Sequence, residues 1–195
     1  IIGSYAFYNC FIIQHLKIPQ SVTEIGERAF EFIYFLHDIS LPPKIKTIEN
    51  NLFHRCSHLT EIKIPSSVTS IKSYAFNDCS NLTKVSIPES VTYIGDSAFS
   101  QCNFLKEIEI PSSVTSTGCQ IFEDCSELTK VTLSSSLIEL KDGFFNGCSS
   151  LKQISIPSSV ISIDNSAFCS CSSLIEIEIP SSVKNIGSFC FEDCT

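Results

Sequence analysis

The chain has 195 residues, a formal net charge of −8 and 43% hydrophobic residues. The acidic balance argues against a nucleic-acid-binding protein, which needs a basic stripe, and against simple attraction to an anionic membrane. No apolar run approaches the length that spans a bilayer, so we expect no direct membrane insertion by this segment.

A 23-residue repeat runs through the whole chain without insertion or deletion. A fixed period of this size predicts a solenoid, in which stacked units bury a face that no unit can bury alone. We expect residues 1–195 to form a single solenoid of about eight and a half repeats. The chain starts and stops inside a repeat, without terminal capping repeats, so we interpret it as a fragment of a longer array. The column that marks the period is Phe7, Phe30, Phe53, Phe76, Phe99, Phe122, Phe145, Phe168 and Phe191.

The first element predicted in each repeat is a short helical turn. In the unit Ile94–Ser116 it covers residues 96–102, where Ala98 and Cys102 stand four apart and would share one helical face. In most repeats a Ser, Asn or Asp two residues before the alanine position is suited to cap such a turn. These residues are Ser4, Asn50, Ser73, Asp96, Asp142, Asn165 and Ser188.

A strand is predicted after the turn. Ile108 and Ile110 alternate with Glu107 and Glu109, a pattern typical of a half-buried strand, and Pro111 ends it. A second short extended piece is expected before the next turn, as in residues 91–94. Stacking places equivalent strands side by side. The predicted fold therefore has a parallel sheet on one face, with short helical or 3-10 turns and short extended segments on the other.

The whole chain carries the pattern Leu-x-x-Ile-x-Ile-Pro-x-Ser-Val-x-x-Ile-Gly-x-x-Ala-Phe-x-x-Cys, seen about eight times. This pattern resembles the BspA-like class of leucine-rich repeats, an α/β repeat class that is mainly β here. The commoner leucine-rich repeats have an asparagine ladder after the strand, where this chain has serine or another residue. The resemblance implies a surface or secreted protein of anaerobic bacteria or parasitic protists that binds host matrix proteins or cells. It brings no defined binding residues with it.

The chain has eleven cysteines, and eight of them occupy one column of the repeat. Side chains that point the same way in register do not readily supply the torsion of a disulfide, so we interpret the column as small buried hydrophobes. Cys190 replaces a core alanine, while Cys119 and Cys169 lie at a cap position and an exposed position and should react first. The column consists of Cys10, Cys56, Cys79, Cys102, Cys125, Cys148, Cys171 and Cys194.

The sequence gives little support for a catalytic or a metal-binding site. His54-x-Cys56-x-His58 comes closest to ligand spacing, but Cys56 belongs to the buried column and would point away from the two histidines. Serine is abundant because one column of the repeat contains it. Hydrolysis requires a single serine nucleophile beside a base, and a serine repeated in this way does not form such a site. There is no glycine-rich phosphate loop. We therefore predict no catalytic residues, no metal and no cofactor.

The exposed strand columns vary while the core columns hold constant, which makes the sheet face a candidate recognition surface with an acidic tendency. The alternative is a solvated face whose charges keep the array soluble and discourage edge pairing. The candidate residues are Glu61, Lys63, Lys84, Glu107, Glu109, Lys130, Glu176 and Glu178.

A second candidate surface is an aromatic edge formed by Phe11, Ile12, Tyr34 and Phe35. Tyr34 and Phe35 should stack over Phe11 and Ile12 of the preceding repeat, and Ile33 should lie in the core. Contiguous exposed aromatic side chains often mark a contact site. The alternative is that the patch packs beneath repeats outside this chain.

Two functions from different classes remain open after the sequence analysis. The first is a non-enzymatic binding module, extracellular or at the cell surface, whose partner is a host matrix or cell-surface protein or a glycan. The second is a structural spacer or an intracellular protein-interaction scaffold, in which the faces are merely solvated. The sequon Asn81-Leu82-Thr83 supports secretion only weakly.

Overall fold

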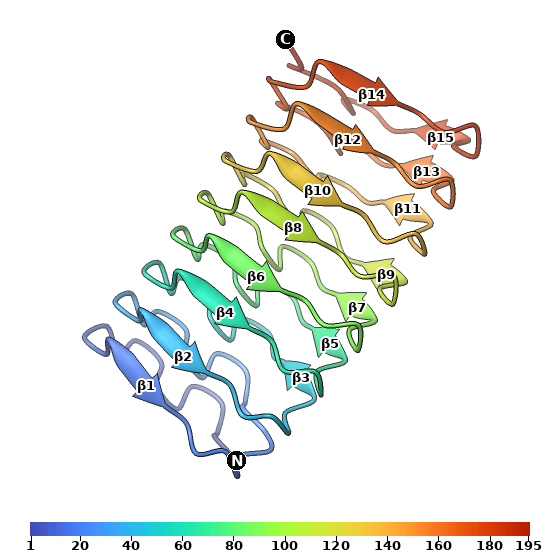
Figure 1. The fold of residues 1–195 in the computed structure, drawn as a ribbon. Coiled ribbons are helices and arrows are strands. Elements are labelled where there is room, and N and C mark those ends of the chain that lie inside the picture. The colour runs from blue at the N-terminus through green and yellow to red at the C-terminus, as the bar shows by residue number, and fades with distance from the viewer.

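The computed structural model describes all 195 residues, which form one continuous solenoid of stacked 23-residue turns, here called rungs (Figure 1). The longer strands, each three residues long, line up along one side of the solenoid as four hydrogen-bonded parallel pairs, and this row of strands is here called the first sheet. These strands are β1 (His15–Lys17), β2 (Asp38–Ser40), β4 (Glu61–Lys63), β6 (Lys84–Ser86), β8 (Glu107–Glu109), β10 (Lys130–Thr132), β12 (Gln153–Ser155) and β14 (Glu176–Glu178).

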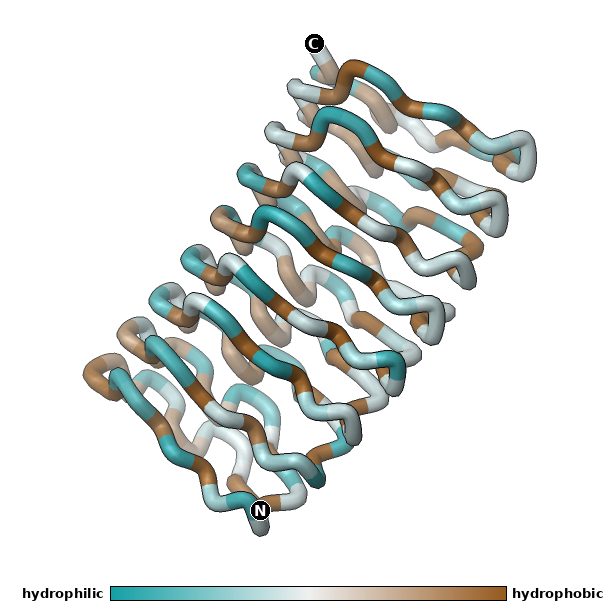
Figure 2. The backbone as a smooth tube through the Cα atoms, in the orientation of Figure 1, coloured by the Kyte–Doolittle hydropathy of each residue, from teal (hydrophilic) through white to brown (hydrophobic).

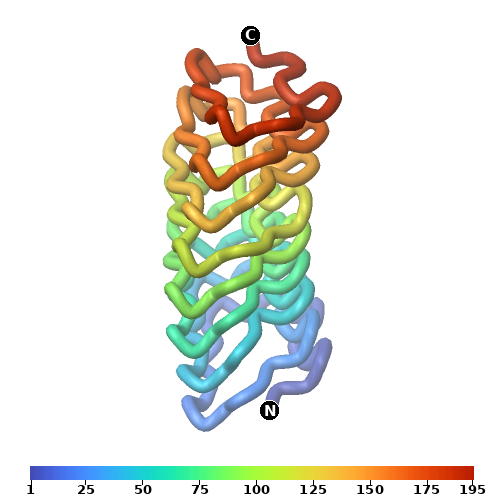
Figure 3. Tube along the Cα trace, turned by 90° about the vertical axis from the view of Figure 1, so that its right-hand side faces the viewer, coloured from blue at the N-terminus to red at the C-terminus, as the bar shows by residue number.

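The two-residue strands lie on another side of the solenoid in a four-stranded and a three-stranded parallel sheet, which together are here called the second sheet. Its strands are β3 (Thr47–Ile48), β5 (Ser70–Ile71), β7 (Tyr93–Ile94), β9 (Ser116–Thr117), β11 (Glu139–Leu140), β13 (Ser162–Ile163) and β15 (Asn185–Ile186). All strand pairs are parallel, and each pairs residues 23 apart, as in His15 with Asp38 and Ile71 with Ile94. The predicted parallel solenoid and its second extended segment are therefore confirmed. The side view shows the rungs stacked in sequence order from one terminus to the other (Figure 3).

The predicted helical turns are wrong, because the structure contains no helix. In the central rung Ser97 and Gln101 have positive φ angles of 50° and 60°, which break a helix twice within one turn segment. The amide of Gln101 donates to the carbonyl of Glu123 in the next rung at 2.7 Å, while the amide of Cys102 donates to Phe99 at 3.2 Å. Bonds that alternate between the same rung and the next replace the helical ladder. Glycine takes the same two columns at Gly143 and Gly147, where φ is 61° and 73°.

Two of the seven predicted cap residues bond to the neighbouring rung instead of capping a helix. The Oδ1 atom of Asp96 accepts the amide of Cys119 at 2.9 Å, and Oδ1 of Asn165 accepts the amide of Ser188 at 2.9 Å. In both cases the acceptor and donor stand in the same column, one rung apart. These side chains satisfy backbone amides that would otherwise be left free at the turn.

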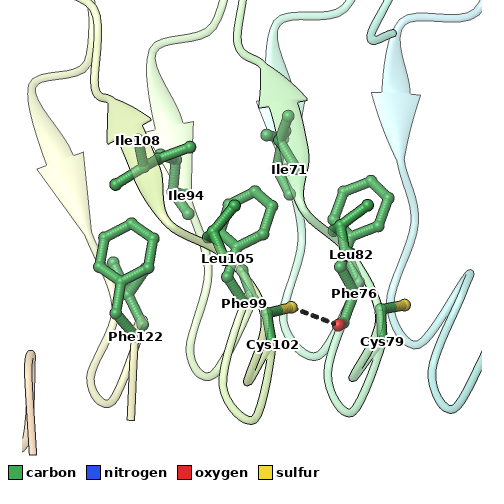
Figure 4. Close-up of a cluster of buried hydrophobic side chains, with 14 of the residues drawn as sticks. Ile71, Phe76, Cys79, Leu82, Ile94, Phe99, Cys102, Leu105, Ile108 and Phe122 are labelled. Atoms are coloured by element: carbon green, nitrogen blue, oxygen red, sulfur yellow. Dashed lines mark hydrogen bonds between the residues drawn. The ribbon is translucent and has the colours of Figure 1, made fainter. Parts of the chain in front are cut away.

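The core is a set of ladders that run the length of the array, and Figure 4 shows the part of it around Phe76, Phe99 and Phe122. The rings of Phe53, Phe76 and Phe99 stack with centroids 5.4 Å and 5.3 Å apart, and each is fully buried. Along the first sheet, a buried or half-buried isoleucine, valine or leucine alternates with exposed polar residues, as the hydropathy colouring shows (Figure 2). The buried-hydrophobe interpretation of the cysteine column is confirmed for six residues, Cys56, Cys79, Cys102, Cys125, Cys148 and Cys171. No helix in the structure has the length and apolarity to cross a membrane.

Candidate functional site

The exposed surface of the first sheet is built by the outer residues of each three-residue strand. In β8, Ile108 is only 4% exposed and points into the core, while Glu107 and Glu109 are exposed on either side of it. Because successive side chains of a strand point to opposite faces, every strand of this sheet presents two outward columns. All eight predicted face residues, from Glu61 to Glu178, are exposed in these columns.

The charges on this face are only partly paired. Lys130 Nζ of β10 lies 3.8 Å from Glu107 Oε2 of β8, and at the N-terminal end of the sheet His15 Nδ1 lies 2.7 Å from Asp38 Oδ2. Neither Glu176 nor Glu178 of β14 takes part in an ion pair, and their neighbours on β12 are Gln153 and Ser155. The later part of the face therefore holds uncompensated negative charge.

Three shallow hollows lie along this face. The largest, about 700 Å³, spans the ends of β2, β4 and β6 and is bordered by Pro43 and Pro65. A second lies over β6 to β10, and a third is lined by residues of β10, β12 and β14 with both Glu176 and Glu178. The sheet side of the solenoid therefore carries three hollows, of which the second and third have mainly polar linings and the first, near Pro43 and Pro65, has a mainly apolar one.

The aromatic edge lies in the loops that lead into β1 and β2, and the loop before β1 is coloured hydrophobic in Figure 2. Phe11 and Tyr34 stack as predicted, with centroids 6.1 Å apart, and Ile33 is fully buried as predicted. Phe35 is 45% exposed, and the centroid of its ring lies 4.9 Å from the centroid of the His58 ring. The structure therefore pairs Phe11 with Tyr34 in adjacent rungs and Phe35 with His58 of the next rung, while Ile12 is 85% exposed.

The His54-x-Cys56-x-His58 segment points to three different partners. His54 Nδ1 lies 2.8 Å from the carboxylate of Glu31, and His58 Nδ1 lies 2.8 Å from the carbonyl of Tyr34. The Cys56 thiol donates to the carbonyl of Phe30 in the core. No group of three His, Cys, Asp or Glu residues in the chain is arranged to hold a metal ion.

The repeated serine column has a structural role. Ser113 Oγ donates to the carbonyl of Val91 at 2.7 Å, and the same bond to the preceding rung recurs at Ser67, Ser90, Ser159 and Ser182. A hydroxyl that donates to a backbone carbonyl of the preceding rung, and that does so in five rungs, ties neighbouring turns together. In all five bonds the partner of the hydroxyl is a backbone carbonyl and not a His, Asp or Glu side chain.

Cys119 and Cys169, predicted to be accessible thiols, are half-buried, whereas Cys190 is buried at 4% exposure as predicted for a core alanine position. Glu31 was missed in the sequence analysis. Its carboxylate is 1% exposed and contacts both Arg28 and His54. The available signal was the 23-residue spacing between Glu31 and His54, which places an acid and an imidazole in one column of adjacent rungs.

Parallel stacked rungs, a continuous apolar core and one variable outward face define a leucine-rich-repeat solenoid. The family model for the BspA type leucine rich repeat region matches residues 1–129 and 92–195, with six copies, and the chain belongs to this family. No curated protein sequence matches the chain.

Solved bacterial structures share the fold. A leucine-rich repeat protein from Bacteroides ovatus is 30% identical to this chain, with a TM-score of 0.60. The match covers 93% of this chain and 58% of the B. ovatus protein. A leucine rich cell surface protein from Faecalibacterium prausnitzii is 26% identical, with a TM-score of 0.58 over all of this chain and 74% of its own. The leucine rich repeat protein of T. pallidum is 27% identical, with a TM-score of 0.62 over 90% of this chain and 71% of its own. This chain thus spans less than two thirds of the B. ovatus protein.

Proposed function

We propose that this chain is a non-enzymatic protein-binding module, an adhesin-like segment of a cell-surface or secreted protein that recognises a host or matrix protein. The observation that carries the proposal is the exposed face of the first sheet, whose two outward columns change from rung to rung over an unchanging core. A rigid scaffold with a variable face can present many side chains with little loss of backbone conformational entropy on binding.

The similarity to a cell surface protein of F. prausnitzii supports the location. The unpaired Glu176 and Glu178, together with Glu109, favour a partner with a basic surface, because charge complementarity steers association and selects orientation. The rival function is a structural spacer or an intracellular interaction scaffold, for which the same charges would serve solubility alone.

The test is binding of the purified chain to immobilised matrix proteins, glycans and cell-surface extracts, beside a variant in which Glu107, Glu109, Glu176 and Glu178 are changed to lysine. The matched control places four lysines away from the first sheet, at Glu24, Glu139, Asp142 and Glu192, which gives the same change of net charge. Saturable binding that only the first variant loses supports an adhesive sheet face.

Equal loss in both variants would show that net charge, and not the sheet face, decides binding. The absence of saturable binding by the unchanged chain would contradict the proposal and favour the spacer or intracellular scaffold.

A further inference from the structure

The turn side of the first three rungs differs in chemistry from the rest of the array. Residues 1–58 contain both arginines and all four histidines of the chain. They also contain Tyr5, Tyr8 and Phe32, whereas the corresponding turns of later rungs are mainly Ser, Asn, Asp, Gln and Glu. These turns lie on a different side of the solenoid from the first sheet (Figure 1).

Five of these side chains form a contiguous surface, which we call the turn-side platform: Tyr5, Tyr8, Arg28, Phe32 and Arg55. Tyr8 packs edge-to-face against Tyr5 at 5.6 Å and against Phe32 at 5.5 Å. The guanidinium of Arg28 lies 5.9 Å from the ring centroid of Tyr5, and that of Arg55 lies 5.5 Å from the ring centroid of Phe32. Tyr5 and Tyr8 remain 50% and 42% exposed.

A buried carboxylate holds this platform in place. Glu31 is 1% exposed, and its oxygens lie 3.0 Å from Arg28 and 2.8 Å from His54. The ring of His54 in turn lies 5.4 Å from Phe32, and Arg55 is fixed by an ion pair with Asp78 at 3.2 Å. Groups that are already oriented lose little freedom when a partner binds, so the platform is preorganised for contact.

Charge is distributed unevenly along the array. Residues 1–58 contain five basic and five acidic side chains, a net charge of 0, whereas residues 59–195 contain eight basic and sixteen acidic ones, 8 − 16 = −8. An acidic partner is therefore repelled by most of the solenoid and meets no net repulsion near the platform. Like-charge repulsion elsewhere would fix where such a partner docks.

We propose that the turn-side platform is a docking site for a peptide segment of a partner protein in which carboxylates stand beside aromatic or aliphatic side chains. Tyrosine, phenylalanine and arginine are the residues enriched at the centres of protein interfaces, while lysine and glutamate are depleted there. The rings take the apolar side chains. The N–H groups of Arg28 and Arg55 that face away from Glu31 and Asp78 donate to the carboxylates. This site is separate from the sheet face and does not depend on the function proposed for it.

The test begins with a phage-displayed random dodecapeptide library selected on the immobilised chain. An enriched peptide is then synthesised with a fluorescent label, and its Kd is measured by anisotropy for the unchanged chain, Tyr8→Ser, Arg55→Ala and the control Tyr74→Ser. Tyr74 is an exposed tyrosine in the same column as Tyr5 but one rung beyond Arg55, outside the platform. Circular dichroism and urea unfolding establish that each variant is folded.

The expected result is enrichment of peptides with Asp or Glu beside aromatic or aliphatic residues. We expect binding about tenfold weaker or worse for Tyr8→Ser and for Arg55→Ala, as for residues at the centre of an interface, and unchanged for Tyr74→Ser. Enrichment of basic peptides, no enrichment, or binding that survives both platform variants would overturn the proposal. Because the assay does not involve the first sheet, its outcome is independent of the matrix-binding experiment.

Discussion

The thiol of Cys102 donates a hydrogen bond to the carbonyl oxygen of Phe76 in the preceding rung, 3.3 Å away (Figure 4). The same bond recurs between each cysteine of the column from Cys56 to Cys194 and the phenylalanine 26 residues before it. The column therefore contributes more than apolar volume, because each thiol also satisfies a carbonyl in the core.

The first prediction concerns thiol reactivity. Burial raises the pKa of the Cys102 thiol well above its ordinary value, and it raises the pKa of Cys171 to about 12. The thiolate is the reactive form, so we expect Cys102 and its column neighbours to be unreactive with iodoacetamide at pH 8 until the chain unfolds. Desolvation also raises the pKa of Cys119, so we expect Cys119 to react more slowly in the folded chain than in urea, and we expect the half-buried Cys169 to be alkylated before the buried column.

Peptide mass spectrometry over a time course measures this order. Equal labelling of Cys102 and Cys169 in the folded chain would contradict it, and labelling in urea provides the control for intrinsic reactivity.

The second prediction concerns the phenylalanine ladder. Phe99 is fully buried and stacks on Phe76 and Phe122 at 5.3 Å and 5.8 Å, whereas Phe104 in the same rung is 45% exposed. We expect Phe99→Ala to lower the free energy of unfolding by about 3–5 kcal/mol, since it removes a ring from the middle of a close-packed column. Phe104→Ala should cost less than about 1 kcal/mol. Urea unfolding of both variants decides the matter, and similar losses would argue against a ladder-based core.

The third prediction concerns the buried carboxylate of Glu31. Glu31→Gln keeps the shape of the side chain but removes the charge that Arg28 and His54 face. We expect a loss of about 1–2 kcal/mol in the free energy of unfolding, lower than for a fully buried pair because Arg28 is 37% exposed. The exposed Glu24→Gln is the control and should unfold as the unchanged chain does. A stable Glu31→Gln chain would mean that the ion pairs are not needed to hold the turn.

The fourth prediction concerns Glu123, which occupies the same column as Glu31 four rungs further on. Desolvation, helped by the charge of Asp124, raises the pKa of Glu123, while hydrogen bonds from Asn146 and Gln120 oppose the shift. A carboxyl with a raised pKa in the folded state adds stability below its unfolded pKa of about 4.3 and loses it as pH rises through the folded value.

We therefore expect Glu123→Gln to raise the urea midpoint at pH 7 and to leave it nearly unchanged at pH 4. Midpoints at both pH values measure this difference, and a lower midpoint for Glu123→Gln at pH 7 would show that the carboxylate is stabilised in the fold. Glu31→Gln, measured in parallel, should change the pH 7 midpoint in the opposite direction.

The sequence by itself determined the architecture of the array. Because the 23-residue period has no insertion, stacking brings Phe76 over Phe53 and Ile94 over Ile71, and the parallel register follows without any further information. The outward position of Glu107 and Glu109 follows from the alternation around Ile108. For the same reason the exposed sheet face, including Glu176 and Glu178, could be predicted in advance.

Only the tertiary structure decided the turns and the diagonal contacts. Serine and glutamine do not by themselves indicate a left-handed backbone conformation. Ser97 and Gln101 nevertheless adopt it, and their amides donate to the carbonyls of Cys119 and Glu123 in the next rung. The contact of Tyr8 with Phe32 likewise joins residues 24 apart in different columns. A repeat pattern specifies which residues share a column, whereas hydrogen bonds and packing between rungs specify the backbone path and the neighbours across columns. That is why the core was readable from the sequence and the turn-side platform was not.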